Sequence, residues 1–221
     1  MEAMPGEGGA TPRRLAVYLC GSRSFGAAVL GLLCEHGNAV VGVSSPRQDE
    51  KGRTDRLLAA VEERYPEIPH TPSEDFRSRV IPEGTDLIVA AHSHVFIGPR
   101  TRARARLGCI GYHPSLLPLH RGRDAIRWTV HMRERITGGT VYWFTDRIDA
   151  GPIAAQAWCF VRPEWTAGDL WANELFPMGL RLLERVLHDL EEDRVVERPQ
   201  DESLATWEPS WERPPMDRLP E

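Results

Sequence analysis

The chain has 221 residues, of which 41% are hydrophobic and 27% charged, a balance typical of one globular domain with a real core. Its formal net charge of −5 argues against a nucleic-acid partner, because a weakly acidic surface does not attract phosphate backbones. It contains no run of about 18 apolar residues, so no membrane-spanning segment is expected.

The N-terminal segment 1–14 is rich in Gly and Pro and lacks the apolar stretch of a signal peptide, so we predict a disordered lead-in. The four cysteines form no CxxC pair, and three of them lie in apolar runs. Buried free thiols are typical of a reducing compartment, and the sequence therefore favours a cytoplasmic protein.

The first part of the chain predicts a βαβ unit. An apolar strand at 15–19 (LAVYL) leads into the turn 21–26 (GSRSFG), and a helical pattern then runs to Gly37. A second apolar strand follows at 39–43. Two strands joined by a helix over so short a stretch predict a parallel sheet.

The middle of the chain continues this alternation. After a charged loop at 47–56, a helix is expected at 54–65, and apolar strands are expected at 86–91 and 107–112. A basic helical segment, a long irregular loop and a short helix are expected at 100–106, 113–123 and 126–133.

The last third of the chain changes character. Segments 140–144 and 153–161 are β-rich and flank a turn, which predicts an antiparallel pair that continues the sheet. A long amphipathic helix is expected at 167–190, with a kink at Pro177.

The final segment is rich in Pro, Trp and charge, and either packs through Trp207 and Trp211 as an extended arm or stays loose. We therefore predict a lead-in at 1–14, one catalytic domain at 15–198 and a C-terminal arm at 199–221. The predicted fold class is α/β: a Rossmann-like open, mostly parallel sheet with helices on both faces and antiparallel strands late in the chain.

The first candidate site is the turn 21–26, which joins a strand to the N-terminus of a helix, a natural position for an anion. It lacks the GxGxxG and GK[ST] spacings, so a nucleotide phosphate is not expected there. Two interpretations remain open, namely binding of another substrate group and a tight turn that only needs glycine.

Other candidates carry side chains suited to proton transfer or metal binding. His113 follows a buried strand, at the edge where open α/β sheets bind ligands. Asp146 and Asp149 flank a later turn, either as functional carboxylates or as residues that shape the turn. His92 and His94 would share one face of a strand, but no third ligand is in sight, so we predict no metal site.

Taken together, the stretches YHPSLLPLHRG, AIRWT, IDAGPI and ATW resemble the formyltransferase family that uses 10-formyltetrahydrofolate. They are most similar to the hydrolase domain of 10-formyltetrahydrofolate dehydrogenase. The likeness covers roughly residues 15–209, and His113 and Asp149 are 36 residues apart (149 − 113), as in that family. The resemblance implies an enzyme that takes a formyl group from a folate carrier.

The resemblance also implies roles for particular residues. His113 and Asp149 would be the catalytic pair. Two loops would hold the pterin of 10-formyltetrahydrofolate through backbone groups and an apolar wall, namely Phe96, Ile97, Gly98, Thr145, Asp146, Arg147 and Ile148. The acceptor amine would meet Gly21, Ser22, Ser24, Gly111 and Ser115.

The residue types suit this chemistry. An amine that attacks the formyl carbon creates an oxyanion, which a histidine can stabilise while a carboxylate orients that histidine and helps to move the proton. One position departs from the family, because transferring members carry asparagine two residues before the histidine and this chain has Gly111. Loss of a donor of this kind costs about 10²–10³ in rate in other enzymes. The hydrolase domain of the dehydrogenase also lacks this asparagine.

Three functions therefore remain open: formyl transfer to the amine of a small molecule, hydrolysis of 10-formyltetrahydrofolate by water, and non-catalytic folate or ligand binding. The retained His113 and Asp149 argue against the third. Transfer to methionyl-tRNA is not expected, because few residues follow the ATW motif and the net charge is negative. A homodimer is compatible with the sequence, which does not set the oligomeric state.

Overall fold

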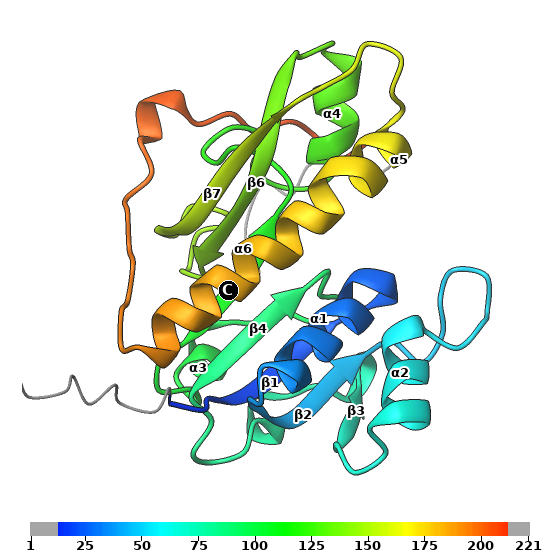
Figure 1. Cartoon of the computed structure of the whole chain (residues 1–221), viewed down its shortest axis with the longest axis vertical. Coiled ribbons are helices and arrows are strands. Elements are labelled where there is room, and N and C mark those ends of the chain that lie inside the picture. The colour runs from blue at the N-terminus through cyan, green and yellow to red at the C-terminus, as the bar shows by residue number, and fades with distance from the viewer. Residues whose placement is uncertain (1–12, 212–221) are drawn as a thin grey trace, which may run out of the picture.

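Seven strands form one sheet in the order β3-β2-β1-β4-β5-β6-β7 (Figure 1). The structure is a computed structural model, and it describes residues 13–211. Neighbouring strands from β3 to β5 are parallel, whereas β6 is antiparallel to both β5 and β7. This confirms the predicted Rossmann-like sheet with antiparallel strands late in the chain. The strands are β1 Ala16–Gly21, β2 Ala39–Ser45, β3 His70–Pro72, β4 Leu87–Ala91, β5 Cys109–His113, β6 Ile136–Trp143 and β7 Ile153–Phe160.

Helices cover the sheet because its central strands alternate apolar side chains to both faces. Val17 and Leu19 of β1 share one buried cluster with α1, α2 and α6, whereas Tyr18 packs on the opposite face with Phe76 and Ile97. The long helix α6 crosses one face in Figure 1. The helices are α1 Arg23–Glu35, α2 Arg56–Arg64, α3 Pro99–Arg102, α4 Ala125–His131, α5 Ala167–Leu170 and α6 Phe176–Glu191.

One strand of the structure was not predicted, and one helix is shorter than predicted. The three-residue strand β3 was not predicted, since so short a segment containing Pro72 has no apolar alternation. The basic helix predicted at 100–106 was too long, and α3 ends at Arg102. Arg104 and Arg106 lie beyond the helix. The guanidinium of Arg104 donates to the carbonyl of Ile81, and that of Arg106 donates to the carboxylate of Asp86.

The predicted helix 167–190 is interrupted rather than simply kinked. Helix α5 runs into one π-helical turn at Trp171–Leu175, and α6 begins directly after it. Pro177 lies in the first turn of α6, where its missing N–H costs little. The proline therefore lies next to the interruption, which takes the form of a π-helical turn.

The segment 199–211 packs along the sheet edge and the loop before α4, which settles the two alternatives for this part of the predicted arm. The amide of Arg121 donates to the carbonyl of Thr206, and the amide of Thr206 donates to the carbonyl of Pro118. Trp211 packs edge-on against Trp128, with ring centroids 4.9 Å apart. Most of the predicted lead-in (1–12) and the end of the arm (212–221) lie outside the described residues. Within 13–211, no helix is long and apolar enough to cross a membrane.

Candidate active site

Strand β5 brings His113 to the carboxyl edge of the sheet. The strand lies between β4 and β6, and its residues alternate between two surroundings. Tyr112 points toward α1 and α6, where its hydroxyl donates to the carbonyl of Leu175 at 2.7 Å. Gly111 and His113 therefore share the other face, as predicted from the alternation of a strand.

The ring of His113 is held between a carbonyl and a carboxylate. Its Nε2 donates to the carbonyl oxygen of His120 at 2.7 Å, so this nitrogen carries a hydrogen. Its Nδ1 faces Asp149, with 3.7 Å between Nδ1 and Oδ2. The residue is 7% exposed. The structure thus brings together the two side chains predicted to be the catalytic pair, from segments 36 residues apart (149 − 113).

The carboxylate of Asp149 is fixed through both oxygens. Oδ2 accepts the amide N–H of Gly122 at 2.7 Å, and Oδ1 accepts the hydroxyl of Tyr142 at 2.5 Å. Burial, followed by the negative charge of Asp149, raises the pKa of Tyr142 well above its ordinary value, so its hydroxyl remains a donor. Asp149 itself has a φ of 50°, in the left-handed region. Its carboxylate therefore sits on a tight turn and is held from two sides.

Phe144 occupies the space beside Gly111. A Cβ built on Gly111 would lie 2.5 Å from Cε1 of the Phe144 ring. The ring of Phe144 in turn stacks on Tyr142, with centroids 5.2 Å apart and planes at 25°. An aromatic wall thus stands where a side chain at position 111 would project.

On the acceptor side predicted from the resemblance, the hydroxyls of Ser22 and Ser115 are both fully buried and bonded within the protein. Ser22 Oγ donates to the carbonyl of His92 at 2.7 Å, and Ser115 Oγ donates to the carbonyl of Leu119 at 2.6 Å. Gly21 allows a close approach, because a Cβ there would lie 2.8 Å from the carbonyl oxygen of Ala91. Ser24, at the start of α1, is exposed.

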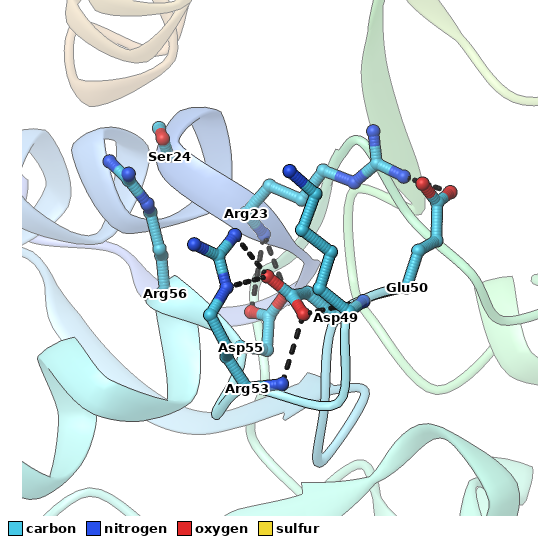
Figure 2. A pocket seen from close by; sticks show the side chains of 8 residues that line it. Arg23, Ser24, Asp49, Glu50, Arg53, Asp55 and Arg56 are labelled. Atoms are coloured by element: carbon cyan, nitrogen blue, oxygen red, sulfur yellow. Dashed lines mark hydrogen bonds and ion pairs between the residues drawn. The ribbon is translucent and has the colours of Figure 1, made fainter.

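A hollow of about 230 Å³ lies beside Ser24 (Figure 2). The carboxylate of Asp55 accepts the amide of Arg23 at 2.9 Å, so the protein's own carboxylate fills part of the N-terminal anion position of α1. Arg23 pairs with Glu50, whereas Lys51 and Arg56 have no ion-pair partner among residues 13–211. The hollow is lined by Arg23, Ser24, Asp49, Glu50, Lys51, Arg53, Asp55 and Arg56.

The two loops predicted to hold the pterin lie side by side. Phe96 is 60% exposed, Ile97 is buried, and a Cβ on Gly98 would press on the Phe96 ring. Arg102 joins the loops, since it donates to the carbonyl of Ile97 at 3.0 Å and pairs with Asp146.

The rest of the later loop is organised by short contacts. The hydroxyl of Thr145 accepts the amide N–H of Arg147 at 3.3 Å, and Arg147 also bonds Glu202. Ile148 is half-buried.

Beside the earlier loop lies a second hollow, of about 360 Å³, lined by Ser73, Phe76, Arg77, Ser78, Val95, Phe96 and Thr101. The hydroxyl of Ser73 is buried and has no hydrogen-bond partner among the described residues. A polar atom left without a partner in a hollow of this kind suits a ligand group.

His92 and His94 do not share a strand, which corrects the prediction. Strand β4 ends at Ala91, and His92 has a φ of 59°, so both histidines lie in the following loop. Their ring centroids are 5.6 Å apart. Among residues 13–211 there is no group of three side chains placed to hold a metal ion.

Besides Gly122, Tyr142 and Phe144, three further residues that were not predicted surround the pair, namely His120, Arg121 and Gln200. His120 is 3% exposed and lies between Glu134 and Glu208, each 2.9 Å from one of its ring nitrogens. His120 and Arg121 belong to the HRG stretch that carried the resemblance, but no local pattern marks Gln200. Gln200 lies in the C-terminal arm, beyond the end of α6 at Glu191, and the fold of the arm brings it to the site.

The chain is similar to known proteins over most of its length. A family model described as formyl transferase matches residues 13–184. The mitochondrial 10-formyltetrahydrofolate dehydrogenase of Mus musculus is 33% identical over 203 residues, which are 88% of this chain but 22% of that protein. The methionyl-tRNA formyltransferase of Thermotoga maritima is 30% identical, over 88% of this chain and 64% of that protein. The chain thus spans about a fifth of the dehydrogenase.

Solved structures share the fold. Glycinamide ribonucleotide transformylase 1 from Symbiobacterium toebii superposes with a TM-score of 0.69 at 21% identity, over 85% of this chain and 93% of that one. The N-formyltransferase from Helicobacter canadensis, solved with folinic acid and dTDP-3-aminofucose, superposes with a TM-score of 0.71 at 14% identity, over 87% and 70%. From the family match and the sequence identity, the chain belongs to the formyl transferase family.

Proposed function

We propose that this chain transfers a formyl group from 10-formyltetrahydrofolate to the amine of a small molecule, with His113 and Asp149 as the catalytic pair. The observation that carries the proposal is the pairing itself. A carboxylate anchored on both oxygens faces a buried imidazole at 3.7 Å, at the carboxyl edge of the sheet. Acyl transfer to an amine requires a hydrogen-bond donor, here the imidazole, and a group that orients it, here the carboxylate.

The reaction moves one carbon between two nitrogens. The amine nitrogen attacks the formyl carbon, the bond from that carbon to N10 of the folate breaks, and one proton passes from the amine to N10. Because Nε2 of His113 is committed to the carbonyl of His120, its Nδ1 is the nitrogen available to the formyl oxygen. Asp149, beside Nδ1, orients the ring and helps to take the proton from the amine.

We place the formyl donor between the two loops that Arg102 joins. The pterin would bond backbone groups of Thr145–Ile148 and pack on the loop Phe96–Gly98, whose exposed phenyl ring offers an apolar wall. The rest of the carrier would extend into the second hollow, where the unpartnered hydroxyl of Ser73 and the guanidinium of Arg77 suit polar and acidic groups.

We place the acceptor beside the turn 21–26. Gly21 and Gly111 leave room for its amine, Ser22 and Ser115 shape the walls, and the exposed hydroxyl of Ser24 contacts it. Lys51 and Arg56 line the adjoining hollow without ion-pair partners among the described residues. They favour an acceptor that carries a negative charge.

Hydrolysis is the second candidate, and one observation favours it. The ring of Phe144 stands where an amide donor at position 111 would project, so transfer lacks that donor. Water in place of the amine would release formate and tetrahydrofolate at the same pair.

Turnover of 10-formyltetrahydrofolate by the purified protein separates these functions. The folate product is followed by absorbance, without an amine and with panels of amino sugars, amino acids and phosphorylated amines. The proposal predicts release that depends on an amine, with a formylated product identified by mass. Release that is equal without any amine would replace the transferase by a hydrolase, and folate binding without release would replace both by a binding protein.

A further inference from the structure

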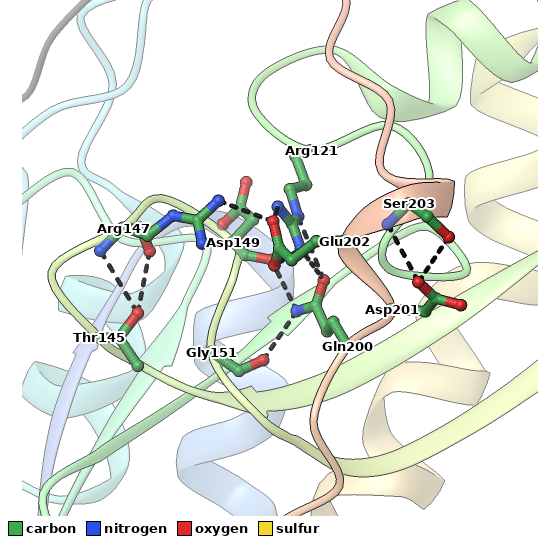
Figure 3. Close-up of polar contacts among 9 residues, drawn as sticks. All are labelled: Arg121, Thr145, Arg147, Asp149, Gly151, Gln200, Asp201, Glu202 and Ser203. Atoms are coloured by element: carbon green, nitrogen blue, oxygen red, sulfur yellow. Dashed lines mark hydrogen bonds and ion pairs between the residues drawn. The ribbon is translucent and has the colours of Figure 1, made fainter.

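The C-terminal arm makes polar contacts with the loop that follows His113 and with the turn that carries Asp149 (Figure 3). Thr206 accepts the amide of His120 at 2.8 Å, next to the carbonyl that receives His113. Gln200 reaches the other loop, at the turn that carries Asp149. The arm therefore touches the surroundings of both side chains.

Gln200 uses its whole amide group at this turn. Its Nε2 donates to the carbonyl of Asp149 at 2.8 Å and to the carbonyl of Gly151 at 2.7 Å. Its Oε1 accepts from Nε and Nη2 of Arg121, at 3.1 and 2.7 Å. The NH₂ group of the side chain is its only donor to the two carbonyls, and the oxygen is its only acceptor for the guanidinium. The contacts therefore fix which way the Gln200 amide is oriented.

Arg121 ties this contact to the carboxylate of Asp149. The residue is 4% exposed, and its guanidinium also bonds both oxygens of Glu202. The next amide along the chain, that of Gly122, donates to Oδ2 of Asp149. One dipeptide thus holds the side chain of Asp149 through its backbone and holds Gln200 through its side chain.

The turn needs such a restraint. Asp149 has a φ of 50°, in the left-handed region that residues with a side chain adopt only at an energetic cost. The side chain of Gln200 bonds the carbonyl of Asp149 itself and the carbonyl of Gly151, two residues later. Without these bonds, the backbone can relax and carry the carboxylate away from His113.

We propose that Gln200 is a positioning residue: it fixes the Asp149 turn so that the carboxylate stays opposite Nδ1 of His113. The inference rests on the proposed function for its effect on rate, but not for its effect on the position of Asp149. Neither the resemblance nor the local sequence assigns a role to this residue.

Two variants and one control test it. Gln200→Met removes the donors without adding charge, and Gln200→Glu keeps an oxygen for Arg121 but loses the donors to the carbonyls. Ser203→Ala is the matched control, since among residues 13–211 the hydroxyl of Ser203 bonds only Asp201, in the same arm. In both Gln200 variants we expect kcat for release from 10-formyltetrahydrofolate to fall about 10- to 100-fold, with KM for the folate nearly unchanged.

A second measurement does not depend on activity. The amide of Gly122 donates to Asp149, so its hydrogen exchange, followed by NMR without folate, reports whether the carboxylate is in place. We expect faster exchange of this amide in both Gln200 variants, and no change in Ser203→Ala or at Val89 in the core strand β4. Unchanged Gly122 exchange, or unchanged kcat in an active protein, would overturn the inference. If the unmodified protein shows no turnover but Gly122 exchanges faster in both Gln200 variants, the positioning role is upheld and the proposed function is refuted.

Discussion

The ring of Phe144 fills the space into which a side chain at position 111 would project. A Cβ on Gly111 would lie 2.5 Å from Cε1 of the ring and 3.4 Å from the Cβ of Ala90. Phe144 also stacks on Tyr142, the donor to Asp149. Gly111 and Phe144 therefore fit each other beside the catalytic pair, and a donor cannot be added at 111 without moving the ring.

Gly111→Asn is expected to destabilise the protein by about 1–3 kcal/mol, because the added side chain overpacks against Phe144. It should not increase formyl transfer. Combining it with Phe144→Ala should recover part of the lost stability, since the ring is then gone. Urea unfolding of the two single variants and the double variant measures this coupling. Additive effects of the two changes would contradict the matched fit.

Gly151→Ala is expected to disturb the catalytic turn. A Cβ at Gly151 would overlap the carbonyl oxygen of Trp143, so the backbone must shift two residues after Asp149. We expect lower thermal stability and reduced turnover. Gly31→Ala is the control, because a Cβ there meets no atom within 4 Å and alanine in a helix gains roughly 0.5–1 kcal/mol. Equal behaviour of the two variants in thermal unfolding and in turnover would refute the steric argument.

Acid should loosen the arm through Glu202. Hydrogen bonds from Arg121 and Arg147 lower the pKa of Glu202 from 4.5 to about 2. Since the docked arm favours the ionised form, its attachment is fully present above pH 4.5 and weakens as the pH falls toward 2. Pepsin cleavage near Leu204, compared at each pH with Glu202→Gln, measures the effect. The variant should lose this pH dependence; cleavage that rises equally in both proteins would argue against it.

The cysteines should react slowly and in a fixed order. Burial raises the pKa of Cys20 and Cys109, and raises that of Cys159 to about 11, so few of these thiols are ionised near neutral pH. Cys34 also has a raised pKa but is only partly buried. Iodoacetamide at pH 8 should therefore label Cys34 first in the folded protein, as read by peptide mass spectrometry. Early labelling of Cys20 would contradict the buried core.

The parts of the site that a sequence can predict are those set by local pattern. Strand β5, the stiff loop after it and the turn at Asp149 each follow from apolar runs, glycine and proline. The resemblance added the pairing of His113 with Asp149. The contact between Phe144 and Gly111 could not be predicted from local pattern, because it depends on the register of β5 against β6.

The contacts of Gln200 were beyond the sequence for a related reason. It is 79 residues from Arg121 and 51 from Asp149 along the chain. Apart from the short 3-10 helix Glu202–Leu204, the arm is irregular, and its path depends on tertiary packing, which has no sequence period. The break before α6 was predicted only as a kink, since Pro177 signals an interruption but not whether the backbone bends or widens into a π turn.

The most direct test of the central claim compares single-turnover release from 10-formyltetrahydrofolate by the unmodified protein, by His113→Ala and by Asp149→Asn, with folate binding measured in parallel. We expect a loss of about 10²–10⁴ in rate for each variant while folate binding is retained, because the pair acts on the reacting groups and the two loops hold the carrier. Release at the full rate by both variants would contradict the assignment of His113 and Asp149 as the catalytic pair.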